Sequence, residues 1–526
     1  MTDALIQALQ DPALYDHPVD RFEVIETHIS WVLLTGPYAY KLKKPVDFGF
    51  VNFTTLERRK FFCGEELRLN QRLAPAWYLD VVPITGTVDG PRLRGAGPAI
   101  EYAVKMKQFP QDARLDLVLA RGALTPERLD AEVSAIAEFH GRAAVAAVDS
   151  PFGTPERIAN RVQENLATIR EHLADPGDLP LVERLDSRAR DEHAALARTF
   201  AARKRDGFIR ECHGDLHLGN MAWVDGRPLI FDCIEFNDDL RWIDVMSEFA
   251  FLVMDLDHRD AAALARRALN AYLEATGDYA GLRVLPYYYA YRSLVRAKVA
   301  CLRLRQGDPD PAARAATRRE LRGYLDLAAG PSTSDRPVLI MTHGVSGSGK
   351  THVAQAVVEA LGAVRIRSDV ERKRLAGLSP RSRAGSEPGG GIYSRELTER
   401  TYARLGDLAG MSLDAGYPVV VDATFLKRAQ RDGLRAVARS HAAPCVILAA
   451  QAPESVLRER IVARAQHGRD ASDADLAVLD GQLRSMDPLA TDEQGIAVTV
   501  DTARALDPAW LVEAIRARGA GAATGL

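Results

Sequence analysis

The stretch HGVSGSGKT, from His343 to Thr351, fits the pattern GxxxxGK[ST]. It lies directly after the apolar run VLIMT and directly before the helical run HVAQAVVEAL. Glycines in such a loop let the backbone curl until several N–H groups point inward, and the next helix adds the partial positive charge of its N-terminus. The stretch therefore predicts a loop that cradles the phosphates of ATP.

The polar groups of this loop have distinct expected tasks. Lys350 is expected to reach the β- and γ-phosphates and to assist the transfer, and the Thr351 hydroxyl is expected to bind Mg²⁺. The positions predicted to contact the nucleotide are Gly344, Ser346, Gly347, Ser348, Gly349, Lys350 and Thr351.

The rest of the second half alternates short apolar strands with helical segments, which is the pattern of a parallel sheet covered on both faces. The expected strands are VLIMT, AVRIRS, YPVVVDA, CVILAA and IAVTV. We therefore predict an α/β P-loop NTPase domain with a parallel sheet, whose ligands bind beside the carboxyl ends of the strands.

Asp369 follows one of these strands, and Arg372 lies three residues further on. A carboxylate at this position could accept the proton of an acceptor hydroxyl, while the arginine holds the acceptor or the moving phosphoryl group. The alternative is that Ser368 or Asp369 only caps a helix.

Asp422 ends the strand of PVVVDATF and is predicted to act on the Mg²⁺ shell. Ala423 follows it where a second acid would activate water, so the pattern favours phosphorylation of a substrate over hydrolysis. Arg460 and Arg464 share one helix face. We expect Arg460 to bind the nucleotide and Arg464 to stabilise the transferring phosphoryl group, although a solvated charged helix is the alternative.

This half resembles the small P-loop kinases, including the gluconate-kinase, zeta-toxin and polynucleotide-kinase relatives, over about residues 338 to 502. The resemblance implies ATP and a hydroxyl acceptor.

A second phosphotransfer motif, HGDLHLGN, runs from His213 to Asn220. In this pattern Asp215 would accept the acceptor's hydroxyl proton, and Asn220 would bind Mg²⁺. The following AWVDGRPLIFDCIEF reads as a strand, a DG turn and a strand that ends at Asp232, the expected second metal ligand. The alternative is a set of buried polar groups that cap helices.

Together these motifs resemble the aminoglycoside and choline phosphotransferases of the kinase-like fold, over about residues 20 to 325. The resemblance implies a lysine on an N-lobe strand and a glutamate on the next helix. YAYKLKKPV offers Lys41 and Lys43 on one strand face, of which Lys43 is favoured. Of Glu65 and Glu66, we select Glu66 as the partner. No GxGxxG precedes the lysine strand, so a loop of another kind must cover the phosphates.

Two further acids follow the hairpin in the sequence. Asp244 lies where relatives have a structural aspartate that supports the catalytic loop, and Glu235 could line an acceptor pocket.

The turn-forming stretch GPSTSDRP, Gly330 to Pro337, separates the two halves. Before it, extended segments precede long helical ones, which predicts an α+β two-lobed protein-kinase-like domain. The expected organisation is a kinase-like domain over 1–330, a linker over 330–337 and the P-loop domain over 338–526.

The composition narrows the class of partner. The 526 residues carry a net charge of −3, which argues against general affinity for nucleic acid. Five cysteines show no CxxC or zinc-like spacing, and no run of 18 apolar residues occurs. We expect a cytoplasmic protein without a membrane partner, which acts on a small-molecule hydroxyl acceptor.

The sequence therefore predicts an ATP-dependent phosphotransferase with two kinase sites, each using Mg²⁺ and ATP on hydroxyl groups of small polar metabolites. One alternative is a single active kinase domain regulated by a nucleotide-sensing P-loop domain. Another is a nucleic-acid end kinase that uses the basic run RIRSDVERKRLAGLSPRSR, which is disfavoured because no aromatic platform lies beside that run.

Overall fold

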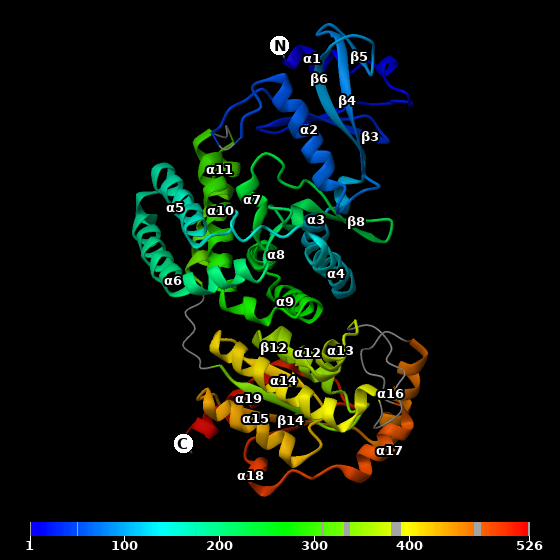
Figure 1. The fold of residues 1–526 in the computed structure, drawn as a ribbon, viewed down its shortest axis with the longest axis vertical. Coiled ribbons are helices and arrows are strands. Elements are labelled where there is room, and N and C mark those ends of the chain that lie inside the picture. Colours follow the sequence, from blue (N-terminus) through cyan, green and yellow to red (C-terminus); the bar gives the residue numbers. More distant parts are fainter. Residues whose placement is uncertain are drawn as a thin grey trace. The chain divides into compact units, whose positions relative to one another are not determined.

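The computed structural model describes residues 2–49, 51–173, 175–306, 310–330, 337–379, 391–467 and 475–523. The chain forms two compact units (Figure 1). Unit 1 combines Met1–Arg259 with Tyr287–Ala329, and unit 2 combines Asp260–Pro286 with Gly330–Leu526. Each unit is described by itself.

The N lobe of unit 1 is an antiparallel sheet of six strands in the order β1-β2-β3-β6-β4-β5. Its strands are β1 (Glu23–Glu26), β2 (Ser30–Leu34), β3 (Tyr38–Lys43), β4 (Tyr78–Thr87), β5 (Gly90–Leu93) and β6 (Ala99–Lys107). Tyr40 and Leu42 of β3 pack into a core with α1 (Thr2–Ala8). Because side chains alternate along a strand, Lys41 and Lys43 lie on the opposite face.

Helix α2 (Leu56–Asn70) follows β3 and packs on the central strand β6. Its start is fixed by Thr55, whose hydroxyl accepts a hydrogen bond from the Arg58 N–H. The helix buries Cys63, Glu66, Leu69 and Asn70. Glu66 is thus a charged side chain on the buried face of this helix.

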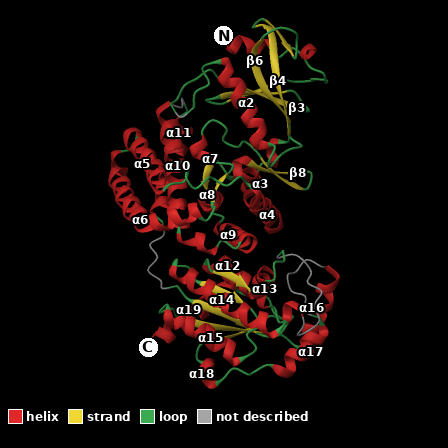
Figure 2. Ribbon diagram, viewed as in Figure 1, coloured by secondary structure: helices red, strands yellow, loops and turns green. Residues whose placement is uncertain are grey.

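The second lobe of unit 1 is mainly helical (Figure 2). Its long helices are α4 (Pro126–Arg142), α5 (Pro155–His172), α6 (Leu179–Arg205), α8 (Val245–His258), α10 (Leu285–Gln306) and α11 (Pro311–Ala329), with the short α3 (Leu115–Ala120) and α7 (Asp238–Arg241). Two small strand pairs join them, β7 (Ile209–Glu211) with β10 (Trp242–Asp244), and β8 (Met221–Val224) with β9 (Arg227–Ile230). The β8–β9 turn has Asp225 and Gly226 at φ 51° and 73°, as a tight DG hairpin requires.

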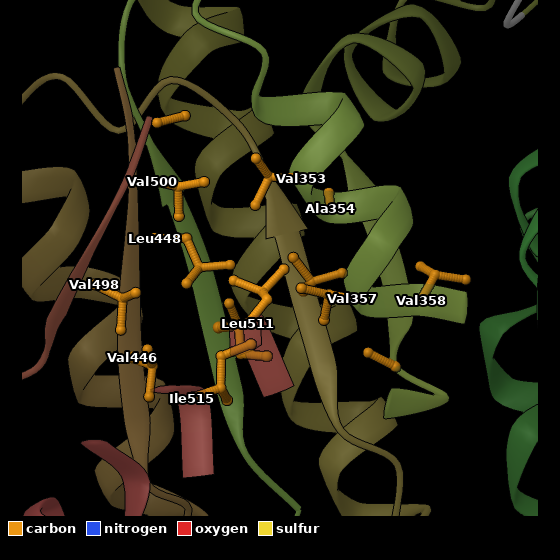
Figure 3. Packing of buried hydrophobic residues seen from close by; sticks show 14 residues of the cluster. Val353, Ala354, Val357, Val358, Val446, Leu448, Val498, Val500, Leu511 and Ile515 are labelled. Carbon is orange, nitrogen blue, oxygen red and sulfur yellow. The ribbon is translucent and has the colours of Figure 1, made fainter. Parts of the chain in front are cut away.

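Unit 2 contains a parallel sheet of five strands in the order β12-β13-β11-β14-β15. Its strands are β11 (Leu339–His343), β12 (Val364–Arg367), β13 (Val419–Asp422), β14 (Cys445–Gln451) and β15 (Ala497–Asp501). One face packs against α12 (Lys350–Leu361) and α19 (Pro508–Ala523), where Val353, Val357, Leu511 and Ile515 meet Val446 and Leu448 (Figure 3). On the other side lie α14 (Arg395–Asp414) and α15 (Arg428–Ser440). The two-lobed kinase-like fold and the parallel P-loop fold predicted from the sequence are both confirmed.

The segment 260–286 was assigned to the first domain from the sequence, but it packs with unit 2. Its helix α9 (Ala262–Thr276) lies beside β12, an edge strand of the sheet. The Asn270 side chain donates to the Ala363 carbonyl at 3.1 Å and accepts from the Arg365 N–H at 2.6 Å. The Tyr279 hydroxyl donates to the Arg365 carbonyl at 3.3 Å. These side chains satisfy backbone groups that an edge strand leaves unpaired.

Candidate active sites

The loop from His213 to Asn220 brings two predicted site residues of unit 1 together. The Asn220 side-chain amide donates to Asp215 Oδ2 and to the Asp215 carbonyl, both at 3.0 Å. Strand β8 begins at the next residue, so Asn220 is fixed between the loop and the hairpin. This pairing can combine proton acceptance at Asp215 with metal binding at Asn220.

Two buried acids of α8 hold the loop backbone, and sequence reasoning missed both. Glu248 accepts hydrogen bonds from the N–H groups of His213 at 2.9 Å and Gly214 at 3.0 Å. Asp255 accepts from the Leu218 N–H at 3.0 Å. Both acids are buried in a largely apolar helix, seven residues apart and so on one helix face. That spacing is the signal that could have found them.

Asp244, which the sequence assigned to loop support, makes different contacts. Its carboxylate pairs with the Arg203 guanidinium at 2.6 and 2.8 Å and accepts from the Met246 N–H at 2.8 Å. Asp244 therefore caps α8, the helix whose acids hold the loop.

The Asp215 carboxylate is in its charged form at neutral pH. Partial burial disfavours its charge, but His217 and Arg296 outweigh this and hold the pKa of Asp215 well below its usual range. His217 Nε2 lies 3.4 Å from Asp215 Oδ2, and 35% of the Asp215 side chain stays accessible. An ionised, accessible carboxylate can accept a hydrogen bond from an acceptor hydroxyl.

Asp232 follows β9 in a left-handed conformation at φ 67°, which is uncommon outside glycine. Its N–H donates to the Tyr78 hydroxyl at 3.1 Å. Lys41 Nζ donates to Asp232 Oδ1 at 2.5 Å and lies 2.9 Å from Glu66 Oε1. Asp232 keeps 46% of its side-chain surface accessible, so it can still take a metal ion.

Lys43 lies deeper than Lys41, with 2% of its side chain exposed against 12%. Its Nζ donates to Glu66 Oε2 at 2.7 Å and also pairs with Glu235. Burial alone disfavours the charge of Glu66, but the two lysines outweigh burial and lower its pKa to about 2. Glu65 pairs instead with Arg68. The expected lysine–glutamate contact is thus present twice, and Lys41, not the favoured Lys43, stands beside the accessible Asp232.

The phosphate-binding loop of unit 2 connects β11 to α12. Gly344, Gly347 and Gly349 have φ angles of 144°, 81° and 85°, which favour glycine. A Cβ on Gly344 would lie 2.7 Å from the Ala450 carbonyl oxygen, and one on Gly347 would lie 2.8 Å from that of Leu457. The loop has no room for side chains at these positions. Its N–H groups and the α12 N-terminus suit a phosphate group.

Lys350 and Thr351 begin α12 at the end of this loop. Lys350 Nζ donates to the Val345 carbonyl at 2.8 Å, so the ammonium group folds back over the loop. Val345 itself packs with Leu457, Ile461 and Leu479, which belong to α16 (Glu454–His467) and α17 (Leu476–Ser485). These two helices therefore cover the loop.

The acidic candidates of unit 2 lie at the carboxyl edge of the sheet. The strand register pairs Arg367 of β12 with Asp422 of β13, whose charged groups lie 3.9 Å apart. Asp369 lies in the first turn of α13 (Ser368–Leu375), and the N-cap residue of that helix is Arg367, so neither Ser368 nor Asp369 is the cap.

Arg372 is buried and anchors to the neighbouring helix. Its Nη1 donates to Thr398 Oγ1 at 2.9 Å and to the Ile392 carbonyl at 3.2 Å. Its Nε has no hydrogen-bond partner among the residues that the structure describes. A buried guanidinium with one unused donor can still bind an anionic group.

Arg460 binds the carbonyl side of the phosphate loop. It donates to the Gly347 carbonyl at 3.3 Å and to the Thr502 carbonyl at 2.7 Å. Arg460 therefore holds the loop at the Gly347 carbonyl and links it to Thr502, which follows β15. The side chain of Arg464 lies outside the described residues.

Gln482 of α17 contacts the phosphate-binding loop, and no sequence motif predicts this contact. Its side-chain carbonyl accepts a hydrogen bond from the Ser346 N–H at 2.7 Å. The bond occupies one of the amide groups that the sequence assigns to the nucleotide. The two residues lie 136 positions apart, so no local pattern connects them.

The donor sets of both sites suit Mg²⁺ bound together with phosphate. Among the described residues, no group of three or more His, Cys, Asp or Glu side chains is arranged to hold a metal ion. Mg²⁺ in phosphotransfer sites takes only one or two protein carboxylates and completes its shell with phosphate oxygens and water. The predicted ligands, Asn220 with Asp232 and Thr351 with Asp422, include one carboxylate in each unit, which is the number such a site uses.

None of the described helices is long and apolar enough to cross a bilayer.

Comparison with known proteins gives the same two-part division. Residues 110–285 match the model of the phosphotransferase enzyme family, and residues 339–489 match that of an AAA domain. The fold and sites thus define a kinase-like phosphotransferase domain followed by a P-loop kinase domain. The chain belongs to the same family as an uncharacterized protein of Mycobacterium tuberculosis (strain ATCC 25618 / H37Rv), to which it is 32% identical over 462 residues. That match covers 87% of this chain and 89% of the relative.

Solved structures match the two halves separately. A gluconokinase from Sinorhizobium meliloti 1021 is 28% identical and covers 36% of this chain and 93% of its own, with a TM-score of 0.25. A choline/ethanolamine kinase family protein from Mesorhizobium loti is 13% identical and covers 62% of this chain and 98% of its own, with a TM-score of 0.37.

Proposed function

We propose that the protein is an ATP-dependent phosphotransferase with two kinase sites, each of which transfers the γ-phosphoryl group of Mg-ATP to a hydroxyl group of a small polar metabolite. The observation that carries the proposal is that each unit brings a lysine and an acid to one part of its fold. In unit 1, Lys41 lies 2.5 Å from Asp232. In unit 2, the Lys350 loop follows β11, and the neighbouring strand β13 ends at Asp422. Each set offers a cation for phosphate and an acid for a metal ion.

In unit 1 we assign the phosphates to Lys41, which Glu66 orients. Asp232 and Asn220 would hold Mg²⁺, which neutralises charge on the transferring group when bound. Asp215 would accept the proton of the acceptor hydroxyl. Accessibility supports Lys41 over Lys43, because a side chain that is 2% exposed has little surface to offer a nucleotide.

In unit 2 we assign the phosphates to Lys350 and the loop amides, and the metal ion to Thr351 and Asp422. Asp369 would accept the acceptor proton, and the unused Nε donor of Arg372 supports a contact with the acceptor or the phosphoryl group. The roles of Arg460 at the nucleotide and Arg464 at the phosphoryl group remain predictions from the sequence.

The test is transfer of labelled phosphate from γ-labelled ATP into a metabolite extract, with products identified by mass. Wild-type protein is compared with Asp215→Asn and Lys350→Ala. We expect each substitution to lower one product, or one step of a series, by at least about a hundredfold. Absence of any transferred label from the wild-type protein would refute the proposal.

A second candidate is that the P-loop half senses nucleotide and governs the kinase-like half. The Gln482 bond to Ser346 and the folded-back Lys350 favour it, because a nucleotide that binds the loop must displace both contacts and so change how α17 meets the loop. In the same experiment, this candidate predicts that Lys350→Ala changes only the rate of the product that depends on Asp215.

A further inference from the structure

The kinase-like site of unit 1 contains one more buried ion pair than the proposed chemistry uses. Lys41, Glu66 and Asp232 account for the nucleotide lysine, its orienting acid and the metal-binding acid. Lys43 and Glu235 form an additional pair, with side-chain exposures of 2% and 4%. We call this the inner pair. Burying two charges is costly unless they are closely paired, so the inner pair calls for a role.

Glu66 joins the inner pair to the proposed nucleotide lysine. Its Oε2 accepts from Lys43 at 2.7 Å, and its Oε1 lies 2.9 Å from Lys41. The Lys43 ammonium group also lies 4.9 Å from the centre of the Phe53 ring. Lys43 is thus enclosed on several sides, and Glu66 depends on two cations for its charged state.

Glu235 lies on the loop that carries Asp232, and this loop makes hydrogen bonds to both lobes of unit 1. The Cys233 N–H donates to Asn70 Oδ1 of α2 at 2.9 Å. The Ile234 N–H donates to the His213 carbonyl of the catalytic loop at 2.9 Å. The loop therefore lies between the N lobe and the catalytic loop, and Glu235 extends from it to strand β3.

From these contacts, and resting on the proposed function of unit 1, we propose that Lys43 and Glu235 are positioning residues whose ion pair ties strand β3 to the Asp232 loop. The pair holds the arrangement in which Lys41 meets Asp232 before any nucleotide binds. Glu235 is then a partner of the N lobe, in place of the acceptor-pocket role that the sequence suggested.

The charges around Lys43 and Glu235 explain why each residue needs the other to hold the Asp232 loop. Without Lys43, the carboxylates of Glu66 and Glu235, which now share one ammonium group, would repel each other at close range. Without the Glu235 charge, Lys43 would keep only Glu66 and would compete with Lys41 for it. Either loss should loosen the Asp232 loop while leaving Lys41 able to reach a phosphate.

The test compares Lys43→Met, Glu235→Gln and their combination with Lys41→Met, all in a Lys350→Ala background that silences the P-loop site. Lys44→Met is the matched control, because Lys44 directly follows β3 and pairs with the exposed Glu26. Three quantities are measured: the Kd of Mg-ATP, the kcat of the Asp215-dependent product, and hydrogen exchange of the backbone amides over 232–235 without nucleotide.

We expect Lys41→Met to raise the Kd of Mg-ATP about tenfold or more, because it removes a charged phosphate contact. Lys43→Met and Glu235→Gln should change that Kd less than about threefold, lower kcat about tenfold or more, and speed exchange over 232–235. The combined variant should be no worse than either single change, because both remove one pair. Lys44→Met should behave like the parent.

Two results would overturn the inference. Lys43→Met could weaken Mg-ATP binding as much as Lys41→Met, which would make Lys43 the nucleotide lysine. Glu235→Gln, a substitution of nearly the same shape, could leave both kcat and hydrogen exchange unchanged. That result would mean that the inner pair only occupies space in the interior and does not position the Asp232 loop. If no protein forms an Asp215-dependent product, the proposed function fails, and the exchange measurement still decides on the pair.

Discussion

Glu132, on α4, is a fully buried carboxyl whose two oxygens have no hydrogen-bond partner among the described residues. Burial raises its pKa well above the usual range. At a pH above the ordinary glutamate pKa, Glu132 therefore keeps its proton in the folded state but loses it in the unfolded chain. Unit 1 should lose stability as the pH rises from the unfolded pKa through the raised folded pKa.

We expect Glu132→Gln to remove that dependence. Between pH 5 and pH 8, the free energy of unfolding of the variant should fall less than that of the wild type, by up to about 1.4 kcal/mol for each pH unit. Denaturant unfolding of unit 1 at both pH values measures the difference. An unchanged difference would mean that the carboxyl is charged and compensated in the folded state.

The lysine pair shows where residue-level prediction from sequence stops. The motif HGDLHLGN and the hairpin after it are local, so Asp215, Asn220 and Asp232 could be selected from spacing alone. Lys41 and Lys43 share a strand face, and no local pattern separates them. The more deeply buried Lys43 pairs with Glu235, which lies 192 positions away in the sequence.

At the scale of elements, α17 and the phosphate loop form a contact that should weaken nucleotide binding. We expect Gln482→Ala to tighten Mg-ATP binding at the P-loop site by about fivefold, because one competing hydrogen bond of about 1 kcal/mol is removed. Calorimetric titration in a Lys41→Met background isolates this site. Arg484→Ala, exposed on the same helix, is the control. Weaker binding in Gln482→Ala would instead place Gln482 among the groups that hold the bound nucleotide.

Helix α9 should stabilise unit 2 through the edge of its sheet. Asn270→Ala leaves the Arg365 N–H and the Ala363 carbonyl without their partner, which should cost about 2 kcal/mol. Denaturant unfolding followed by a probe in unit 2 measures this. A cost below about 0.5 kcal/mol would mean that water replaces the asparagine at this edge.

The elements themselves were largely predictable. Alternation of apolar strands and helices gave the parallel sheet, and the glycine pattern gave the loop between β11 and α12. The position of α9 was not predictable, because an amphipathic helix shows that it has a buried face but not which sheet it covers. Its partner in β12 follows much later in the chain, as the 95 positions between Asn270 and Arg365 show.

At the scale of the whole molecule, two units of different fold each carry a set of phosphotransfer residues on one chain. The turn-rich stretch at Gly330–Pro337 indicated two domains, and the compact units add that the chain enters unit 2 once before that stretch, over Asp260–Pro286. That residues 1–330 and 338–526 are the two independently folding domains remains a prediction.

Both units are expected to bind nucleotide. The most direct measurement is the number of Mg²⁺-complexed, non-hydrolysable ATP analogue molecules that bind tightly per chain at equilibrium. It compares the wild-type protein with Lys41→Met, Lys350→Ala and the double variant. We predict two tight sites in wild type, one in each single variant and none in the double variant. A single tight site in wild type that one of the two substitutions removes and the other leaves intact would contradict this prediction.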